Sequence, residues 1–223
     1  MKLFFSLLSF FLGFGCFLFG ENEKEIFKTV TPEFVGMDSK KLQWVDTKMN
    51  DLVANEKLVG GIVMVARQGK VAHFGTYGLR DREKNLPMEQ DTIFRIYSMT
   101  KAITSVAALM LEEEGKLNLN DSISKYFPSL KKMKVLGRSG LIEPKREVTV
   151  ADLLRHTSGL TYAWSSQKEI REAHRDAGVL NRGTKLVPMV HGMSKIPLVF
   201  HPGSDWVYGC STDVLGGVVE VAS

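Results

Sequence analysis

The sequence predicts an α+β fold, because an amphipathic helix and an antiparallel hairpin come first and mainly helical segments follow. Apolar residues recur at helical spacing over residues 38–57. Two short apolar runs, 62–66 and 71–78, flank a turn that contains Gly69, which is typical of a β-hairpin. A two-stranded hairpin is not stable by itself, so we expect strands from outside this chain, or another molecule, to complete its sheet.

The remaining elements are predicted in order from turn and cap signals. The apolar run 102–111 predicts a buried helix that ends at Gly115. Thr149 and Asp152 have the spacing of a capping box, which marks the start of a short helix. The other predicted segments are a loop at 79–90, a strand-like approach at 92–97, a short helix from 121 to before 128, a polar stretch without a clear period at 161–195 and a helix at 211–221.

The composition is that of a globular protein and disfavours several functions. Hydrophobic residues make up 44% of the chain and charged residues 24%, which argues against disorder. The net charge of +4 is spread along the chain and forms no basic stripe, so nucleic-acid binding is disfavoured. No set of His, Cys or carboxylate residues has metal-ligand spacing, and we expect neither a metal nor a cofactor.

The N-terminus has the pattern of a targeting segment. A short basic start precedes an almost continuous apolar run at 3–20. We interpret residues 1–20 as a signal peptide, with an uncleaved membrane anchor and lipid attachment at Cys16 as the alternatives. Residues 21–223 would then be exported to the periplasm or the extracellular space. Removal of the signal leaves Cys210 as the remaining cysteine, so no internal disulfide is expected.

The most informative motif is Ser98-Met99-Thr100-Lys101 at the start of the predicted buried helix. A serine there lies near unpaired backbone N–H groups and the positive end of the helix dipole, and a lysine three residues later shares its face. Such a pair can act as nucleophile and proton acceptor. The alternative is an N-capping serine beside a surface lysine. The same spacing recurs in polar settings that would not desolvate a lysine, at Ser122/Lys125, Ser129/Lys132 and Ser165/Lys168.

Four motifs in order carry a family resemblance. They are Ser98-Met99-Thr100-Lys101, Gly-Lys-Leu-Asn-Leu-Asn-Asp at 115–121, Leu-Leu-Arg-His-Thr-Ser-Gly-Leu at 153–160, and Pro-Gly-Ser-Asp-Trp-Val-Tyr with Asp-Val-Leu-Gly at 202–216. In this order and spacing, residues 30–223 resemble the superfamily of class C β-lactamases, D-alanyl-D-alanine carboxypeptidases and family VIII esterases. The resemblance implies a β-lactamase/transpeptidase-like α+β fold, with an antiparallel sheet flanked by helices and a helical subdomain.

The resemblance also implies catalytic roles. Ser98 would be the acylated nucleophile, Lys101 its proton-handling partner and Tyr208 a second proton carrier. Either burial and the helix N-terminus lower the pKa of Lys101 so that it is the base, or Lys101 stays charged and stabilises a Tyr208 phenolate that takes the proton. The backbone N–H of Ser98 would stabilise an oxyanion. We expect the amine and the phenol to converge on the Ser98 hydroxyl within a dry cleft.

Two departures from the family pattern shape the functional prediction. Cys210 stands where many members have an asparagine that helps hold the amide side chain of the substrate, and a thiol lacks those donors and acceptors. Family VIII esterases also lack this asparagine, so an ester is preferred over a β-lactam or a peptide. The third motif, a Lys-Thr-Gly or related strand, does not occur between Tyr208 and Ser223. We therefore expect residues 21–223 to be an incomplete hydrolase domain that lacks the last strands of its sheet and is inactive as given.

Other interpretations stay open. Cys210 and Trp206 are predicted to bind substrate, but Trp206 and Trp164 are equally typical of buried packing, and Cys210 is more typical of a packed core residue than of a nucleophile. His156 is predicted to be a hydrogen-bonded structural residue. The predicted partner is a small ester or amide substrate. The sequence gives no prediction of the oligomeric state. The alternative function is a non-catalytic relative that binds cell-wall peptide or a partner protein.

Overall fold

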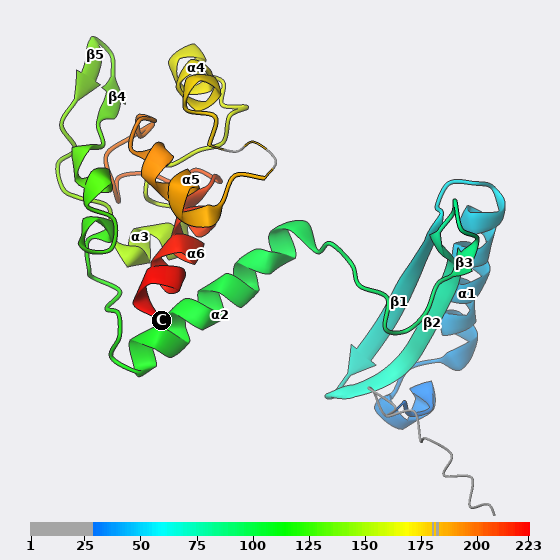
Figure 1. Ribbon diagram of the computed structural model, residues 1–223. Helices are drawn as coiled ribbons and strands as arrows, with labels where there is room; N and C mark the ends of the chain where they lie inside the picture. Colours follow the sequence, from blue (N-terminus) through cyan, green and yellow to red (C-terminus); the bar gives the residue numbers. More distant parts are fainter. Residues whose placement is uncertain (1–28, 180, 182) are drawn as a thin grey trace, which may run out of the picture. The chain divides into compact units, whose positions relative to one another are not determined.

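The computed structural model describes residues 29–179, 181 and 183–223, and the chain divides into two compact units, one up to Phe94 and one from Arg95 onward (Figure 1). The predicted signal peptide at residues 1–20, with Cys16, lies outside the described residues. Within the described part of the chain, no helix has both the length and the apolar character needed to cross a bilayer. The assignment of 21–223 to one domain stays a prediction.

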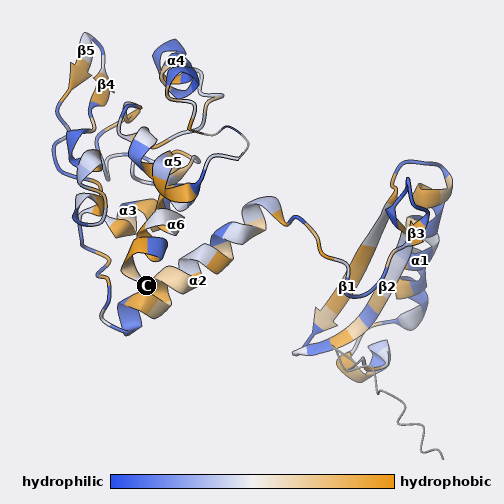
Figure 2. Cartoon of the chain, in the orientation of Figure 1, coloured by the Kyte–Doolittle hydropathy of each residue, from blue (hydrophilic) through white to orange (hydrophobic). Residues whose placement is uncertain are grey.

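The first unit is an antiparallel sheet with one long helix beside it (Figure 1). Strands β1 (Gly60–Arg67) and β2 (Lys70–Asp81) form the predicted hairpin, and Figure 2 shows that β1 is largely hydrophobic. The short β3 (Leu86–Pro87) pairs with the end of β2. The prediction of a loop across 79–90 is therefore wrong, because part of this segment completes a three-stranded sheet.

Local signals explain how the first unit begins and turns. Helix α1 (Ser39–Ala54) starts at Asp38, whose side chain accepts the backbone N–H groups of the next turn. The β1–β2 turn holds Gln68 at φ 53° and Gly69 at φ 69°. Two positive φ angles in a two-residue loop match the right-handed twist of the flanking strands, which is why glycine stands here. A 3₁₀ turn, η1 (Pro32–Val35), precedes α1.

The second unit is mainly helical, and α6 (Ser211–Ala222) lies at its centre. Helix α6 packs against α2, α3 and α5 (Figure 1). The close fit to α5 needs a glycine, because a Cβ at Gly217 would lie 2.6 Å from the Val190 side chain. The other helices are α2 (Thr100–Glu113), α3 (Val150–Arg155), α4 (Lys168–Ala177) and α5 (Leu186–Met193).

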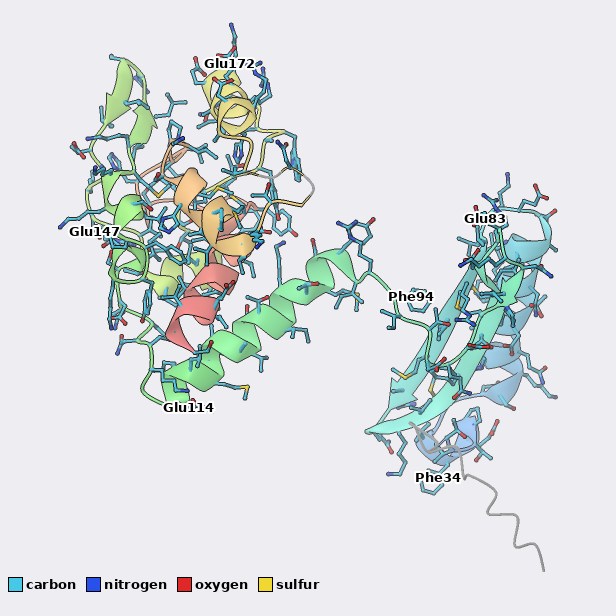
Figure 3. All side chains as sticks on the ribbon, viewed as in Figure 1. Phe34, Glu83, Phe94, Glu114, Glu147 and Glu172 are labelled. Carbon is cyan, nitrogen blue, oxygen red and sulfur yellow. The ribbon has the colours of Figure 1, made fainter. Side chains whose placement is uncertain are left out.

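Shorter elements connect these helices. They are the 3₁₀ turns η2 (Tyr97–Met99), η3 (Ile123–Lys125) and η4 (Pro128–Lys132), and the strands β4 (Val135–Gly137) and β5 (Gly140–Ile142), which form a second small hairpin. Figure 3 shows Glu114 just beyond the end of α2, and Glu147, whose carboxylate accepts hydrogen bonds from the hydroxyls of Ser122 and Ser124 at η3. These contacts tie the connecting segments to the helical core.

Two further predicted segments differ from the structure. Residues 92–97 are not a strand, and the 3₁₀ turn η2, which begins at Tyr97, leads directly into α2. The stretch 161–195, predicted to be without a period, contains α4 and α5. Helix α4 was missed because its sequence is strongly polar and buries little more than Ile170 and His174.

The capping box at α3 is confirmed and anchors the turn that follows. Thr149 and Asp152 exchange side-chain to backbone hydrogen bonds, and Asp152 is fully buried. Its carboxylate also accepts hydrogen bonds from Arg146 and from the Thr157 hydroxyl at 2.9 Å. His156 ends the helix in the left-handed region at φ 58°. One buried carboxylate therefore holds both ends of a six-residue helix.

Candidate active site

Ser98 lies on a constrained turn at the start of the longest helix of its unit. It belongs to η2, directly before α2, and the preceding Tyr97 adopts φ 47°. A left-handed conformation is uncommon for a bulky residue and stores strain next to the serine. The Ser98 Oγ lies 2.7 Å from the hydroxyl of Tyr208, with either atom able to donate.

Lys101, in the first turn of α2, lies against two tyrosines. Its Nζ donates a hydrogen bond to the Tyr162 hydroxyl at 3.0 Å and lies 5.0 Å from the ring centre of Tyr208. The structure therefore brings Ser98, Lys101 and Tyr208 together, as the sequence predicts, and adds Tyr162. Sequence reasoning missed Tyr162, whose one signal is its position two residues after the Leu160 that ends the third motif.

His156 supports the segment that carries Tyr208. Its ring lies 5.1 Å from the Tyr208 ring and 6.3 Å from that of Trp206. Its backbone carbonyl accepts the Val207 N–H at 3.1 Å, and its Nδ1 accepts the Gly209 N–H at 3.4 Å. These contacts bracket Tyr208 on both sides, which is the structural role that the sequence predicts for this histidine.

The pKa values of Lys101 and Tyr208 shift in opposite directions. Burial favours the neutral amine, but the hydrogen bonds with Tyr162 and Tyr208 outweigh it and raise the pKa of Lys101 above its ordinary value. The hydrogen bond from Ser98, and then the Lys101 cation, lower the pKa of Tyr208. Of the two sequence-based alternatives, these directions favour a charged lysine beside an acidified phenol, and they oppose a neutral lysine base.

Asp213 contributes a negative charge that sequence reasoning gave no role. It lies in the first turn of α6, and its Oδ2 is buried with no hydrogen-bond partner among the described residues. Burial raises the pKa of this carboxyl, while the nearby Lys101 cation opposes the shift. The Lys101 cation therefore acts electrostatically on one buried carboxyl group as well as on two phenols.

The described residues leave part of the site open to solvent, and the dry cleft stays a prediction. Ser98 is exposed, and the Tyr208 side chain is 42% accessible to solvent. Trp206 is also exposed, at the rim of the same segment, and Trp164 is exposed and stacks on Tyr162 with ring centres 4.3 Å apart. The two tryptophans are thus not core residues, and substrate contact by Trp206 stays a prediction.

Cys210 faces away from the solvent-exposed part of the site. Its side chain is fully buried, and its Sγ donates to the Thr161 carbonyl at 3.1 Å. Burial raises the pKa of the thiol to about 12, so the thiolate that a nucleophile needs is disfavoured. This placement matches the packed core residue weighed in the sequence analysis and does not favour the predicted substrate contact.

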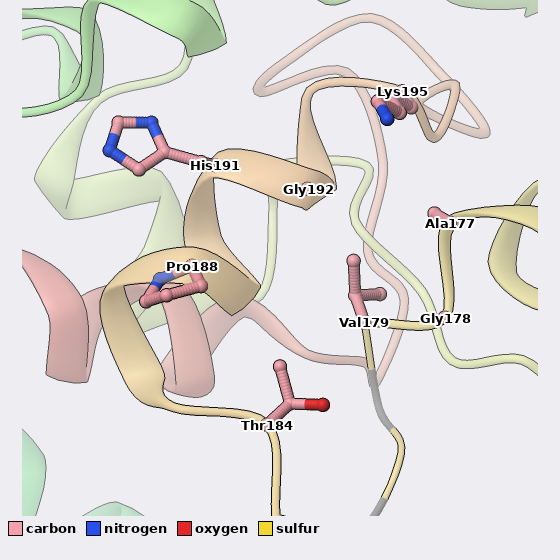
Figure 4. A pocket seen from close by; sticks show the side chains of 8 residues that line it. All are labelled: Ala177, Gly178, Val179, Thr184, Pro188, His191, Gly192 and Lys195. Atoms are coloured by element: carbon pink, nitrogen blue, oxygen red, sulfur yellow. The ribbon is translucent and has the colours of Figure 1, made fainter.

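A separate hollow lies between α4 and α5. Figure 4 shows its lining side chains, which include Val179, Thr184, Pro188 and His191. The Nδ1 of His191 lies 3.0 Å from the hydroxyl of Ser129, another serine with a lysine three residues later. Among the described residues, no group of three or more His, Cys, Asp or Glu side chains is arranged to hold a metal ion.

The family model described as Beta-lactamase matches residues 45–223. This chain belongs to the Beta-lactamase family. Its members share the α+β fold seen here, in which antiparallel sheets and helices carry the matched motifs. The resemblance seen in the four sequence motifs is thereby confirmed, including the β-lactamase/transpeptidase-like fold class.

Relatives within the Beta-lactamase family include hydrolases and acyltransferases. Esterase EstB from Burkholderia gladioli is 35% identical over 182 residues, which are 80% of this chain and 45% of that protein. The structure of EstCE1, a hydrolase with promiscuous acyltransferase activity, has a TM-score of 0.70 at 28% identity over 82% of this chain and 47% of that one. Simvastatin synthase (LovD) from Aspergillus terreus has a TM-score of 0.64 at 29% identity over 81% and 47%. The chain spans about half the length of these relatives.

Proposed function

We propose that this chain carries the nucleophile and the proton-transfer groups of a serine hydrolase that acts on a small ester through an acyl-enzyme. The predicted signal peptide implies that it acts outside the cytoplasm. One observation carries the proposal: the Ser98 Oγ lies 2.7 Å from the Tyr208 hydroxyl, and the Lys101 ammonium lies over the Tyr208 ring. This is a nucleophile within hydrogen-bond reach of a base whose pKa is lowered by that hydrogen bond and then by the neighbouring Lys101 cation.

Acylation begins with the Tyr208 phenolate, which takes the proton from the Ser98 hydroxyl. The Ser98 oxygen attacks the carbonyl carbon of the ester, and the carbonyl oxygen becomes an oxyanion. The backbone N–H of Ser98, next to the N-terminus of α2, is a suitable donor to this oxyanion. The bond from carbon to the leaving oxygen then breaks, and Tyr208 returns its proton to that oxygen, so an alcohol leaves and Ser98 holds the acyl group.

Deacylation repeats these steps with water. Tyr208 takes a proton from the attacking water, the tetrahedral intermediate collapses, and the Ser98 oxygen leaves and recovers the proton. Lys101 stays charged throughout and compensates the negative charge on Tyr208. The products are a carboxylic acid and the free enzyme. The Cys210 thiol faces the core and offers no amide-binding groups, which supports an ester over an amide.

The test is covalent labelling with a fluorophosphonate of the 223-residue chain and of any longer chain that contains this sequence. We expect a label on Ser98 that Ser98→Ala removes and that Tyr208→Phe slows by roughly 10²–10⁴-fold, the usual contribution of a general base. Ser129→Ala is the matched control, because Ser129 has the same spacing to a lysine and a histidine partner.

The outcomes separate the alternatives. A label in a longer chain that contains this sequence, and none in the 223-residue chain, would support both the hydrolase and the expected inactivity of the 223-residue chain. A label in the 223-residue chain itself would overturn that inactivity. A protein that never labels, yet binds peptidoglycan or a partner equally well with Ser98→Ala, would be the non-catalytic relative.

Acyl transfer to an alcohol is a second candidate function, and several of the relatives favour it. EstCE1 is described as having acyltransferase activity, and several matched fungal proteins are named acyltransferases. The same acyl-enzyme gives transfer when an alcohol replaces the attacking water. We expect a new ester to form when unlabelled protein is given an activated ester together with a small alcohol, and acid alone to form if the protein is strictly a hydrolase.

A further inference from the structure

A buried carbonyl lies behind the candidate active site and accepts two hydrogen bonds. The backbone oxygen of Thr161 accepts the Nε2–H of His174 on α4 at 2.9 Å and the Sγ–H of Cys210 at 3.1 Å. All three residues are buried, with exposures of 6%, 4% and 0%. A carbonyl has two lone pairs, so one acceptor can satisfy both donors.

This contact joins the two backbone segments that carry the tyrosines of the site. Thr161 directly precedes Tyr162, which accepts the hydrogen bond from Lys101. Cys210 follows Tyr208 by two residues, and a Cβ at the intervening Gly209 would lie 2.2 Å from the Leu160 carbonyl oxygen. The two backbone segments therefore touch directly, and the two phenol rings lie with their centres 5.9 Å apart.

We propose that His174 and Cys210 are positioning residues that hold the Thr161 carbonyl and thereby set the separation of Tyr162 and Tyr208 around the Lys101 ammonium. Neither side chain reaches Ser98 or the solvent. They act on the reaction through the two tyrosines, and the catalytic part of this inference rests on the proposed function.

The chemistry of both donors fits this role. Burial lowers the pKa of His174, so the imidazole stays neutral, and the acceptor at Thr161 requires the tautomer with its proton on Nε2. The Nδ1 has no partner among the described residues, so it is not held by a competing contact. Burial likewise keeps the Cys210 thiol protonated and able to donate.

The first test reads the pKa of Tyr208 without requiring turnover. The ionisation of tyrosines to tyrosinate is followed by ultraviolet absorbance in the wild type and in Tyr208→Phe. The difference between the two titration curves reports the Tyr208 phenol, which ionises below its ordinary pKa. Cys210→Ala and His174→Leu each remove one donor, and we expect the Tyr208 pKa to move back up toward its ordinary value. Cys210→Ser and His174→Gln keep a donor at the same place, and we expect them to retain the lowered pKa.

The second test is the rate of Ser98 labelling in the same four variants. We expect a fall of roughly 10- to 100-fold in Cys210→Ala and His174→Leu, since displacement of a catalytic group by about 1 Å has effects of this size, and near wild-type rates in the donor-keeping variants. Circular dichroism checks that each variant is folded.

Two results would overturn the positioning role. One is an unchanged Tyr208 pKa and labelling rate in the folded donor-removing variants. The other is a return of the Tyr208 pKa to its ordinary value in Cys210→Ser and His174→Gln, which keep a donor. This second result refutes the positioning role even if the donor-removing variants do not fold. Absence of label in the wild type, both in the 223-residue chain and in a longer chain that contains it, would refute the proposed function alone, because the tyrosinate titration still reports the positioning.

Discussion

Asp152 makes the most quantitative prediction for this protein. Burial by itself would raise the pKa of this carboxyl, but Arg146 and the hydrogen bonds from Thr149 and Thr157 outweigh burial and lower the pKa from 3.8 to about 2. One pKa unit corresponds to about 1.4 kcal/mol, so the charged carboxylate stabilises the folded state by about 2 kcal/mol at neutral pH.

The sign of the pH dependence follows from the lowered pKa. The contribution of Asp152 is complete well above pH 3.8 and is lost as the pH falls through the folded-state value of about 2. Roughly 1 kcal/mol of it is already lost at pH 3. We expect Asp152→Asn to lower the free energy of unfolding at pH 7 by about 2 kcal/mol. Between pH 7 and pH 3 the variant should not show the loss of roughly 1 kcal/mol that protonation of Asp152 causes in the wild type.

The assay is urea unfolding followed by circular dichroism at pH 7 and pH 3, on the wild type and Asp152→Asn. Asp176→Asn is the matched control, because Asp176 is exposed and forms a surface ion pair with the adjacent Arg175. Equal pH dependence in the wild type and Asp152→Asn would refute the reasoning, since the buried carboxylate would then contribute nothing that protonation removes.

Three further predictions concern the site. The rate of Ser98 labelling by an activated ester should rise with pH and level off above the lowered pKa of Tyr208. Tyr208→Phe should flatten this pH dependence. An equally steep dependence in the phenylalanine variant would contradict the role of Tyr208 as the base. Asp213→Asn should lower the pKa of Tyr208 further in a tyrosinate titration, because the carboxylate opposes the phenolate, and an upward shift would be inconsistent with this. Gly209→Ala should destabilise the protein by about 1–3 kcal/mol in urea unfolding, since its Cβ would lie 2.2 Å from the Leu160 carbonyl oxygen. Gly216→Ala is the control and should not destabilise the protein, because its Cβ would lie 3.7 Å from the nearest side-chain atom, on Leu186.

Local patterns predicted the parts of the fold that local interactions determine. The capping box of Thr149 and Asp152 and the hairpin turn at Gly69 are formed by residues close in sequence, so their signals are complete within a few positions. Strand β3 was missed because only Leu86 and Pro87 pair, and a proline within a short run argues against a strand.

The site was predicted in part for the same reason. Ser98 and Lys101 share one helical turn, and their motif is visible in the sequence, whereas the hydrogen bond from Lys101 to Tyr162 joins residues 61 positions apart. The inward direction of Cys210 depends on how α6 packs, which its neighbours in sequence do not determine. For the same reason the sequence did not decide whether the pKa of Lys101 is raised or lowered, because the direction of the shift depends on Tyr162.

The serine and its phenolic partner stand 110 positions apart in the chain. In the proposed mechanism the nucleophile therefore gains its base only after Tyr208 has been synthesised and the segments that carry both residues have folded together. Until that moment the proposed proton transfer from Ser98 has no acceptor. Proteolysis at any point between the two positions would silence the pair unless the cut pieces remain associated.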